Sequence, residues 1–141
     1  MWWYLLAVLT AVFYGLYLTS IKISSDSINQ VVGAVILQVT AAAIGGFVLL
    51  VLKMSNVPLV VTPKGVAFAV YAGLFVGLAE TTTFFVFSKG IPVSVGTPII
   101  IGGSIVVASV IGIYFFHETF RSIDYLALAF VVTGAIILAN R

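Results

Sequence analysis

The sequence GLFVGLAETTTFFVFSKG, residues 73–90, contains one carboxylate, Glu80, among glycines, threonines and large apolar side chains. No other charged residue interrupts residues 65–88. A segment that crosses the hydrocarbon core of a bilayer needs about 20 mostly apolar residues. This stretch therefore predicts a transmembrane helix that carries an acid within the membrane.

The rest of the chain has the composition of a membrane protein. Of its 141 residues, 62% are hydrophobic and 7% are charged, whereas a soluble domain has about a quarter charged residues. The charged positions divide the chain into apolar runs of spanning length. We expect an all-α integral membrane fold, in a single domain over residues 1–141, located in the cell membrane. Its five spans are expected at about 2–21, 28–52, 65–88, 92–116 and 123–139.

The first run is expected to remain in the protein as a helix. It has no basic leader of a signal peptide, and it begins with Trp2 and Trp3, which favour the membrane interface. Three helix starts are predicted from capping patterns. They are Ser27 to Gln30 as a capping box, Thr62 followed by Pro63, and Ser122 with Asp124 in the first turn.

Basic residues between the spans are balanced across the membrane. With the N-terminus outside, Lys22, Lys89 and Arg141 lie inside, and Lys53, Lys64 and Arg121 lie outside. An excess of Lys and Arg on the cytoplasmic side normally sets orientation, so three against three leaves both insertions similar in free energy. Two copies inserted in opposite senses would form an antiparallel homodimer, the symmetry that many transporters build into one chain as inverted repeats.

Small residues at four-residue spacing predict places where helices approach closely, because helix association in lipid depends on close backbone packing. The sets are Ala41 and Gly45, Ala42 and Gly46, Gly73 and Gly77, and Ser104, Ala108 and Gly112. We expect most of them to be packing positions.

Glu80 shares a helix face with Gly77, Thr83 and Phe84, at steps of three and four residues. It lies about 5 Å from the middle of its run, at 1.5 Å per residue. An ionised side chain facing lipid at this depth costs a few kcal/mol. Three roles stay open: a proton carrier, because removal from water favours the neutral carboxyl, a protonated donor that holds helices together, or an ordinary carboxylate near the end of a shorter span.

Other polar residues could line a path through the protein. Gln38 lies in the middle of the second span, where an interhelical hydrogen bond is the alternative role. Threonines could line the same path, although in membrane helices they often bond their own backbone. The further path candidates are Thr10, Tyr14, Tyr17, Thr81, Thr82 and Thr83. Pro98, Gly102 and Gly103 predict a bend or break in the fourth helix that turns backbone carbonyls toward a cavity.

Several other classes of protein are not supported. His117 and Glu118 do not extend to an H-E-x-x-H zinc motif, because residue 121 is Arg. There is no Cys for a thiolate metal site, no G-x-S-x-G elbow and no phosphate-binding glycine loop. A net charge of +2 does not suggest nucleic acid. We expect no enzyme, no metal and no cofactor.

Three stretches resemble EamA-type proteins of the drug/metabolite transporter superfamily. They are YGLYLTSIK at residues 14–22, SKGIPVSVGTP at 88–98 and FFHETFRSIDYLALAFVVTGAIILAN at 115–140. Lys22 and Glu118 match positions where the family has a Lys and a Glu, and anchoring at the membrane interface is the alternative role for both. In three respects the chain departs from the family pattern. Gln38 stands where the family often has Arg, a proline expected near Ser104 is absent, and Glu80 is not part of the pattern.

The resemblance implies a five-helix repeat that pairs with an oppositely oriented copy. It also implies efflux or exchange of small metabolites or drugs at a site between the two repeats near the bilayer midplane. We therefore expect a dimeric transporter that works by alternating access, with proton coupling through Glu80. The candidate lining residues are Glu80, Tyr14, Tyr17, Gln38, Thr83 and Phe84. The alternative is a non-transporting subunit of a larger membrane complex or lipid-carrier system.

Overall fold

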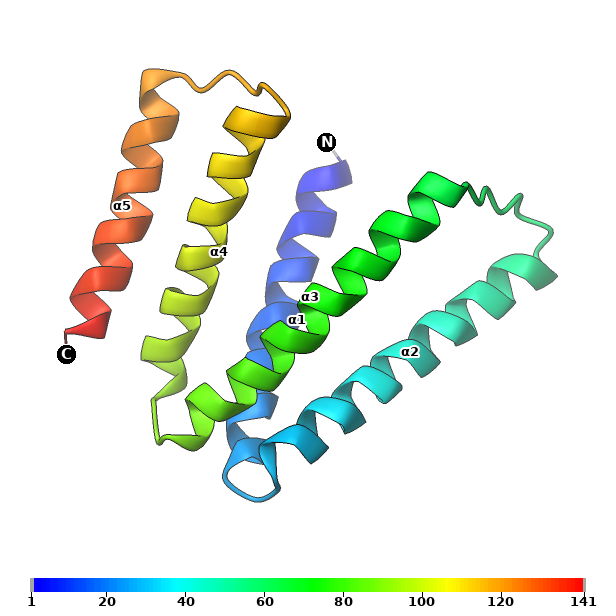
Figure 1. Cartoon of the computed structure of the whole chain (residues 1–141), viewed down its shortest axis with the longest axis horizontal. Coiled ribbons are helices and arrows are strands. Elements are labelled where there is room, and N and C mark those ends of the chain that lie inside the picture. Colours follow the sequence, from blue (N-terminus) through cyan, green and yellow to red (C-terminus); the bar gives the residue numbers. More distant parts are fainter. Residues whose placement is uncertain (1, 141) are drawn as a thin grey trace. The chain divides into compact units, whose positions relative to one another are not determined.

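The computed structural model describes residues 2–140, and all regular structure in this range is α-helical (Figure 1). The helices are α1 (Trp2–Ser25), α2 (Gln30–Met54), α3 (Pro63–Ser88), α4 (Val93–Phe115) and α5 (Ser122–Ala139). Each is long and apolar enough to cross a membrane. The predicted all-helical membrane fold with five spans is therefore confirmed over the described residues.

The chain divides into two compact units. The first unit holds α1 as far as Leu18 together with α4 and α5, and the second unit is Thr19–Gly90, which holds the end of α1 with α2 and α3. Within the first unit α4 and α5 run antiparallel, and within the second unit α2 and α3 do the same (Figure 1). The single domain over residues 1–141 stays a prediction.

The caps of α2 and α3 show how local sequence sets the helix starts. At α3, the Thr62 hydroxyl accepts a hydrogen bond from the Gly65 N–H at 3.1 Å and Pro63 opens the helix, as predicted. At α2, the capping residue is Asn29, whose side-chain oxygen accepts from the N–H groups of Val31 and Val32. The predicted capping box at Ser27 is wrong. Ser27 donates its N–H to the Ser24 carbonyl at 2.9 Å and so belongs to the turn that ends α1.

The start of α5 follows the prediction for its first turn. A carboxylate oxygen of Asp124 accepts the Arg121 backbone N–H at 2.8 Å. The Arg121 guanidinium also lies 3.4 Å from the other carboxylate oxygen. A negative side chain at this position satisfies an N–H group that the helix leaves unpaired and favours the positive end of the helix dipole.

Helix α4 differs from the expected broken helix. It runs without interruption from Val93 to Phe115, with Pro98 inside it and Gly102 and Gly103 in its middle. A proline removes one backbone hydrogen bond, and a helix can continue through that loss. The predicted break is therefore not present in this structure, and a hinge at these residues stays a prediction.

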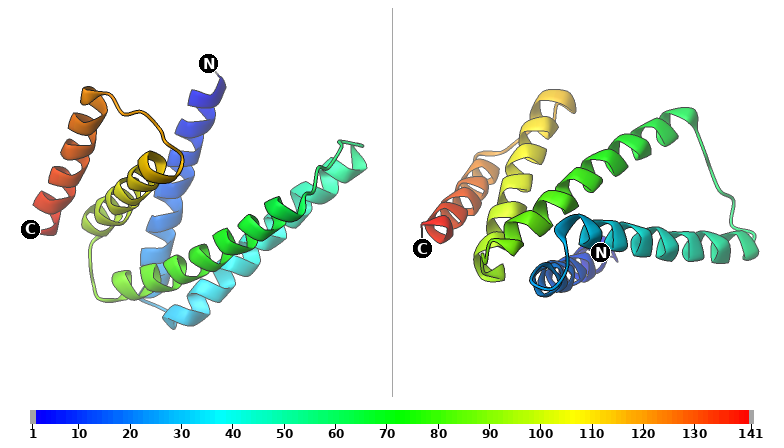
Figure 2. Two further views of the ribbon diagram at one scale, coloured as in Figure 1. Left: turned by 45° about the horizontal axis from the view of Figure 1, so that its top comes forward. Right: turned by 60° about the horizontal axis from the view of Figure 1, so that its bottom comes forward.

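Helices α2 and α3 pack closely at one end and diverge toward the segment that joins them at residues 55–62 (Figures 1 and 2). At the closed end the Phe84 ring lies directly against Gly33, where an added Cβ would overlap it. Seven residues earlier along α3, the Gln38 amide oxygen lies 3.3 Å from where a Cβ on Gly77 would stand. Side chains added at Gly45, Gly46 or Gly73 would meet nothing within 4 Å. These three glycines, which were expected at packing positions, make no such contact within the described chain.

Helices α4 and α5 contact each other through small residues. A Cβ on Gly102 would stand 3.4 Å from Val131 and 3.5 Å from Ala135. A shallow apolar groove of about 290 Å³ runs along this pair, bordered by Pro98, Gly102 and Gly134 among others. Nothing lies within 4 Å of a Cβ added at Gly103, the hinge candidate next to Gly102.

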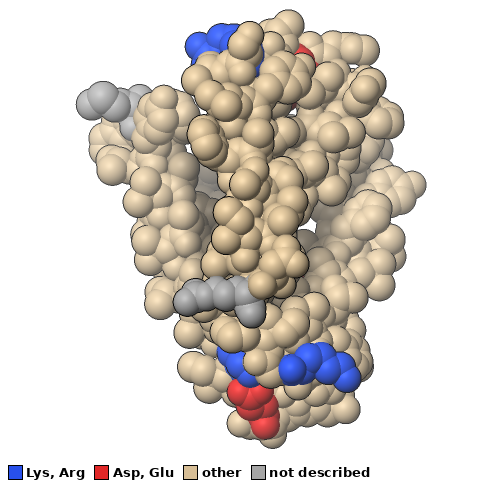
Figure 3. Space-filling view, turned by 90° about the vertical axis from the view of Figure 1, so that its left-hand side faces the viewer, with Lys and Arg blue, Asp and Glu red and all other residues tan. Residues whose placement is uncertain are grey.

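The surface is mostly apolar. Large hydrophobic side chains on every helix are exposed, whereas Phe84 and Phe87 are buried, at 2% and 0% exposure. On the face drawn in Figure 3, blue and red side chains lie near the top and the bottom, and the described atoms between them are tan. Such a surface fits a hydrocarbon environment and not water.

We predict that Gly33→Ala loosens the closed end of the α2–α3 pair. The added methyl group overlaps the buried Phe84 ring, which has no free space to move into. Overpacking of this kind costs about 1–3 kcal/mol. Thermal unfolding in detergent should occur at a lower temperature for this variant than for the wild type. Gly46→Ala, on the same helix with open space around it, is the matched control and should unfold like the wild type. Equal melting of the two variants would show that the contact is not formed.

Candidate functional site

Glu80 lies on the face of α3 that is turned toward α2. Gly77, three residues before it, is in contact range of Gln38, and Phe84, four residues after it, packs on Gly33. Residues at these spacings share one side of a helix. Glu80 therefore sits between the two contacts that close the α2–α3 pair.

The Glu80 carboxyl group has an unsatisfied oxygen. Its Oε2 atom is buried and has no hydrogen-bond partner among the described residues. A buried polar atom without a partner costs about 1–3 kcal/mol, and more when it is charged. The carboxyl is thus the group in the second unit most in need of a partner, which a proton, a cation or another chain would supply.

Gln38, Thr83 and Phe84, all predicted lining residues, lie in the same unit as Glu80. The Gln38 amide lies against Gly77, one turn from Glu80, and the Phe84 ring is buried at the closed end. Thr83 is buried as well, but its hydroxyl donates to the Ala79 carbonyl at 2.8 Å. Of these side chains, Gln38 is the one on α2, so it is the α2 group best placed to meet a solute held at Glu80.

The other threonines also bond their own helix. Thr10 donates to Leu6, Thr81 to Gly77, and Thr82 to both Leu78 and Ala79, at 2.8–3.0 Å. This is the alternative role considered for them from the sequence. Their oxygen atoms can still accept a hydrogen bond, whereas their donors are used.

Tyr14 and Tyr17 belong to the first unit. Their rings contact each other edge to face with centroids 5.8 Å apart. Tyr14 is exposed and Tyr17 half-buried. Pro98, Gly102 and Gly103, the hinge candidates, also lie in the first unit and border or adjoin its groove.

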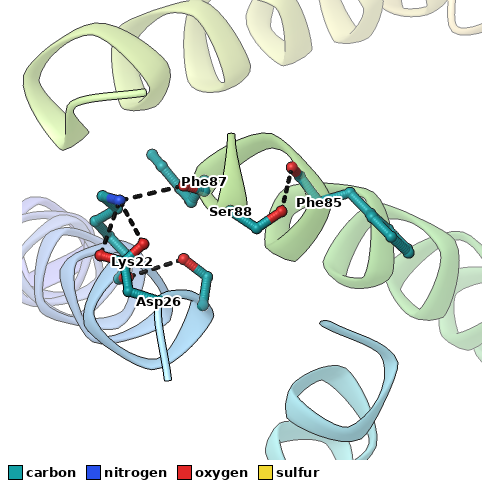
Figure 4. A network of polar contacts seen from close by, with 6 residues as sticks. Lys22, Asp26, Phe85, Phe87 and Ser88 are labelled. Atoms are coloured by element: carbon teal, nitrogen blue, oxygen red, sulfur yellow. Dashed lines mark hydrogen bonds and ion pairs between the residues drawn. The ribbon is translucent and has the colours of Figure 1, made fainter. Parts of the chain in front are cut away.

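Lys22 joins the end of α1 to the end of α3 (Figure 4). Its ammonium group lies 2.8 Å and 3.0 Å from the two carboxylate oxygens of Asp26. It also donates at 3.2 Å to the backbone carbonyl of Phe87 near the C-terminal end of α3, which accepts the Gly90 N–H as well, at 3.1 Å. This link could not be predicted from sequence patterns, because 65 residues separate the two partners.

Glu118, the other residue matched to the family, closes the end of α4. Its backbone N–H donates to the Gly112 carbonyl at 3.1 Å. Its carboxylate lies where a Cβ on Gly112 would be. Gly112 was expected to meet another helix, and it accommodates this side chain instead.

Thr97 was not among the predicted site residues. Its hydroxyl oxygen is buried and has no partner among the described residues, as is the case for Glu80. The adjacent Pro98, already expected to disturb the helix, is the sequence feature that could have pointed to it.

The fold and the unpaired carboxyl define a multi-pass helical membrane protein with an ionisable group inside its spanning region. The model of the EamA-like transporter family matches residues 1–140, nearly the whole chain. The chain therefore belongs to the EamA-like transporter family, as the resemblance from its sequence predicted. Membership supports a multi-pass protein of the cell membrane and fits a role that is not enzymatic. Comparison with curated proteins gave no match, and neither did comparison with solved structures.

We predict that Lys22→Met destabilises the second unit more than Asp26→Asn does. Loss of Lys22 removes a hydrogen bond to a helix end, worth about 1 kcal/mol, in addition to the ion pair. The ion pair alone contributes about 0.5 kcal/mol or less, because it is an i,i+4 pair with Asp26 more than half exposed. Melting in detergent, followed by circular dichroism, measures both variants. If Asp26→Asn proved as damaging as Lys22→Met, the link from Lys22 to Phe87 would contribute nothing.

Proposed function

We propose that this protein transports small molecules across the membrane as an antiparallel homodimer, with Glu80 as the site of a proton or a cation. The observation that carries the proposal is the buried Glu80 oxygen without a partner on the α2-facing side of α3. Structural carboxylates inside proteins are normally hydrogen-bonded. An unpaired one within a membrane span is a candidate for transport chemistry.

Glycines of α2 and α3 that make no contact within the described chain support the inference that a second copy packs against them. Side chains added at Gly45, Gly46 or Gly73 would meet nothing within 4 Å, so these positions of α2 and α3 are open. Small residues of this kind allow close approach by another helix. A partner helix in this space would shield the Glu80 side of α3 from lipid. The single chain leaves part of that side uncovered.

The charges at the ends of the second unit support opposite insertion of the two copies. At one end, Lys22 lies in the last turn of α1 and Lys89 is the C-cap of α3; at the other, Lys53 lies in the last turn of α2 and Lys64 in the first turn of α3. Arg121 precedes α5, and Arg141 lies outside the described residues. The two ends of this unit thus carry equal positive charge, so neither is favoured for the cytoplasmic side.

Transport would follow from rocking of one copy against the other around a central site, the alternating-access movement of repeat-based transporters. Each copy would contribute Glu80, Gln38, Thr83 and Phe84, with Tyr14 and Tyr17 as further lining candidates. The loss or gain of a proton at Glu80 would change the charge of the site between the two states. A small-molecule substrate and the lipid bilayer are the partners that this function requires.

We predict that the chain inserts in both orientations. Fusions of its C-terminus to a reporter active only inside the cell and to one active only outside should give signals of comparable size. The physical reason is the balance of positive charge between the two faces. Adding two lysines to the 55–62 segment should shift the signal strongly to one reporter. A strong bias in the unmodified chain would contradict the antiparallel dimer.

We predict that Glu80→Gln abolishes pH-driven uptake without disturbing insertion. The amide keeps the shape of the carboxylic acid but cannot release a proton. Uptake into vesicles under a pH gradient would be measured with a panel of labelled amines, amino acids and sugars. Leu78→Val, at an exposed position on the same helix, is the control and should keep at least about half of the activity, since surface changes have small effects. Undiminished proton coupling in the Gln variant would exclude Glu80 as the proton site.

A further inference from the structure

We propose that the segment between α2 and α3, residues 55–62, forms with Lys53 and Lys64 a membrane-interface anchor that binds anionic phospholipid. This surface is separate from the proposed transport site, because Lys64 lies sixteen residues, or about 24 Å, before Glu80 along α3. Three properties of the segment support the proposal: exposed apolar side chains, backbone groups without partners, and positive charge without a counter-charge.

The side chains of the segment are apolar and exposed. Every residue from 51 to 70 is exposed in the structure. Val60 and Val61 are 88% and 75% exposed, and Val57 and Leu59 are exposed as well. Apolar side chains that the protein does not cover are more stable in contact with lipid than in contact with water. These side chains therefore favour a position of the segment against the bilayer.

The backbone of the segment excludes it from the hydrocarbon. Helix α2 ends at a turn in which the Val57 N–H donates to the Leu52 carbonyl at 3.1 Å. Beyond that turn, Leu59, Val60 and Val61 make no backbone hydrogen bond among the described residues. Irregular backbone with free N–H and C=O groups does not occur in contact with lipid hydrocarbon, because nothing there can bond it. The segment must therefore lie at the interface, where water and lipid headgroups supply hydrogen bonds.

Lys53 and Lys64 border the segment, in the last turn of α2 and the first turn of α3. Both lysines are exposed. The ion pairs of the described chain involve other basic residues. No Asp or Glu occurs between residues 27 and 79. This end of the α2–α3 pair thus carries two positive charges that its own sequence does not balance.

The opposite end of the same unit is less positive. Lys22 lies 2.8 Å from Asp26 and also donates to a backbone carbonyl, which leaves Lys89 as the exposed lysine there. The three side chains give that end a net charge of +1, whereas Lys53 and Lys64 give their end +2. An anionic surface is therefore attracted more strongly to the end that holds the 55–62 segment.

Anionic phospholipid matches all three properties. Its charged headgroup attracts lysine side chains that extend from the ends of spanning helices. Its acyl chains cover the exposed valines, and its headgroup region can bond the free backbone groups. A zwitterionic phospholipid has no net charge for the lysines, and a soluble phosphate has no apolar part for the valines. The partner that fits is thus an anionic lipid of the bilayer.

The test measures which lipids lie near residue 60. The chain has no cysteine, so Val60→Cys accepts a bimane fluorophore at one site. The labelled full chain is placed in phosphatidylcholine vesicles that contain a small fraction of nitroxide lipid in both leaflets, so either orientation of the chain meets it. The nitroxide lipid is phosphatidylglycerol or phosphatidylcholine. Quenching at low salt should show an enrichment of phosphatidylglycerol of at least about threefold, which high salt should abolish.

The lysines are tested in the same labelled chain. Lys64→Gln should reduce the enrichment of phosphatidylglycerol near residue 60, and Lys53→Gln together with Lys64→Gln should abolish it. Lys89→Gln, at the opposite end of the unit, is the matched control for the single change and should leave the enrichment intact. Nitroxides on the headgroup should quench more strongly than nitroxides near the ends of the acyl chains. Circular dichroism establishes that each variant is folded.

Equal quenching by the two lipids at low salt, or an enrichment that survives the double substitution, would overturn the proposal. Strong quenching by aqueous iodide with weak quenching by either lipid would place the segment in water and would also overturn it. So would stronger quenching from the ends of the acyl chains than from the headgroups. If inorganic phosphate abolished the enrichment while chloride at the same ionic strength did not, the ligand would be a soluble phosphate and the lipid proposal would be wrong.

Discussion

The central constraint on this structure is the free-energy cost of keeping a carboxyl group without a counter-charge inside a membrane span. Glu80 is half-buried, one of its oxygens has no partner among the described residues, and the Lys22 ammonium group is held by Asp26 and Phe87. Hydrocarbon supplies such a group with neither a hydrogen bond nor a counter-charge, and an ionised acid in contact with lipid costs several kcal/mol. The group must therefore be protonated, paired with a cation or covered by protein. The proposed transport cycle would account for its presence. In that cycle the carboxyl would alternate between the protonated state and the cation-paired state while protein covers it.

The same constraint connects features that are distant in the sequence. The α2–α3 pair is closed by Phe84 on Gly33 and open at Gly45, Gly46 and Gly73. Glu80 lies between the Gly77–Gln38 and Phe84–Gly33 contacts and is half-buried, and we propose that a partner chain covers what α2 leaves exposed. Equal positive charge at the two ends of this unit would allow that partner to be an identical chain of opposite orientation. One five-helix sequence would then produce both halves of a transporter.

Much of the fold could be predicted because spanning length and hydropathy report directly on the bilayer. The five helices, the Thr62 cap and the acid in the first turn of α5 follow from local composition. The Asn29 cap was missed because Ser27 belongs to the turn that ends α1, and α2 starts at Gln30, two residues later than predicted. The position of Glu80 toward α2 followed from helical spacing, but the Lys22–Phe87 link and the contact of Glu118 with Gly112 depend on three-dimensional placement. Pro98 failed to break α4 because neighbouring turns keep their bonds.

The most direct test of a carboxyl enclosed by two opposed copies is a distance between the copies in a bilayer. The chain has no cysteine, so a single Val60→Cys, at an exposed position between α2 and α3, carries one nitroxide label per copy. Pulsed dipolar spectroscopy should then give an intermolecular distance of about 30 Å or more, because opposed copies place the labels on opposite sides of the hydrocarbon. A distance clearly shorter than the hydrocarbon thickness, or no dipolar signal at all, would contradict the account.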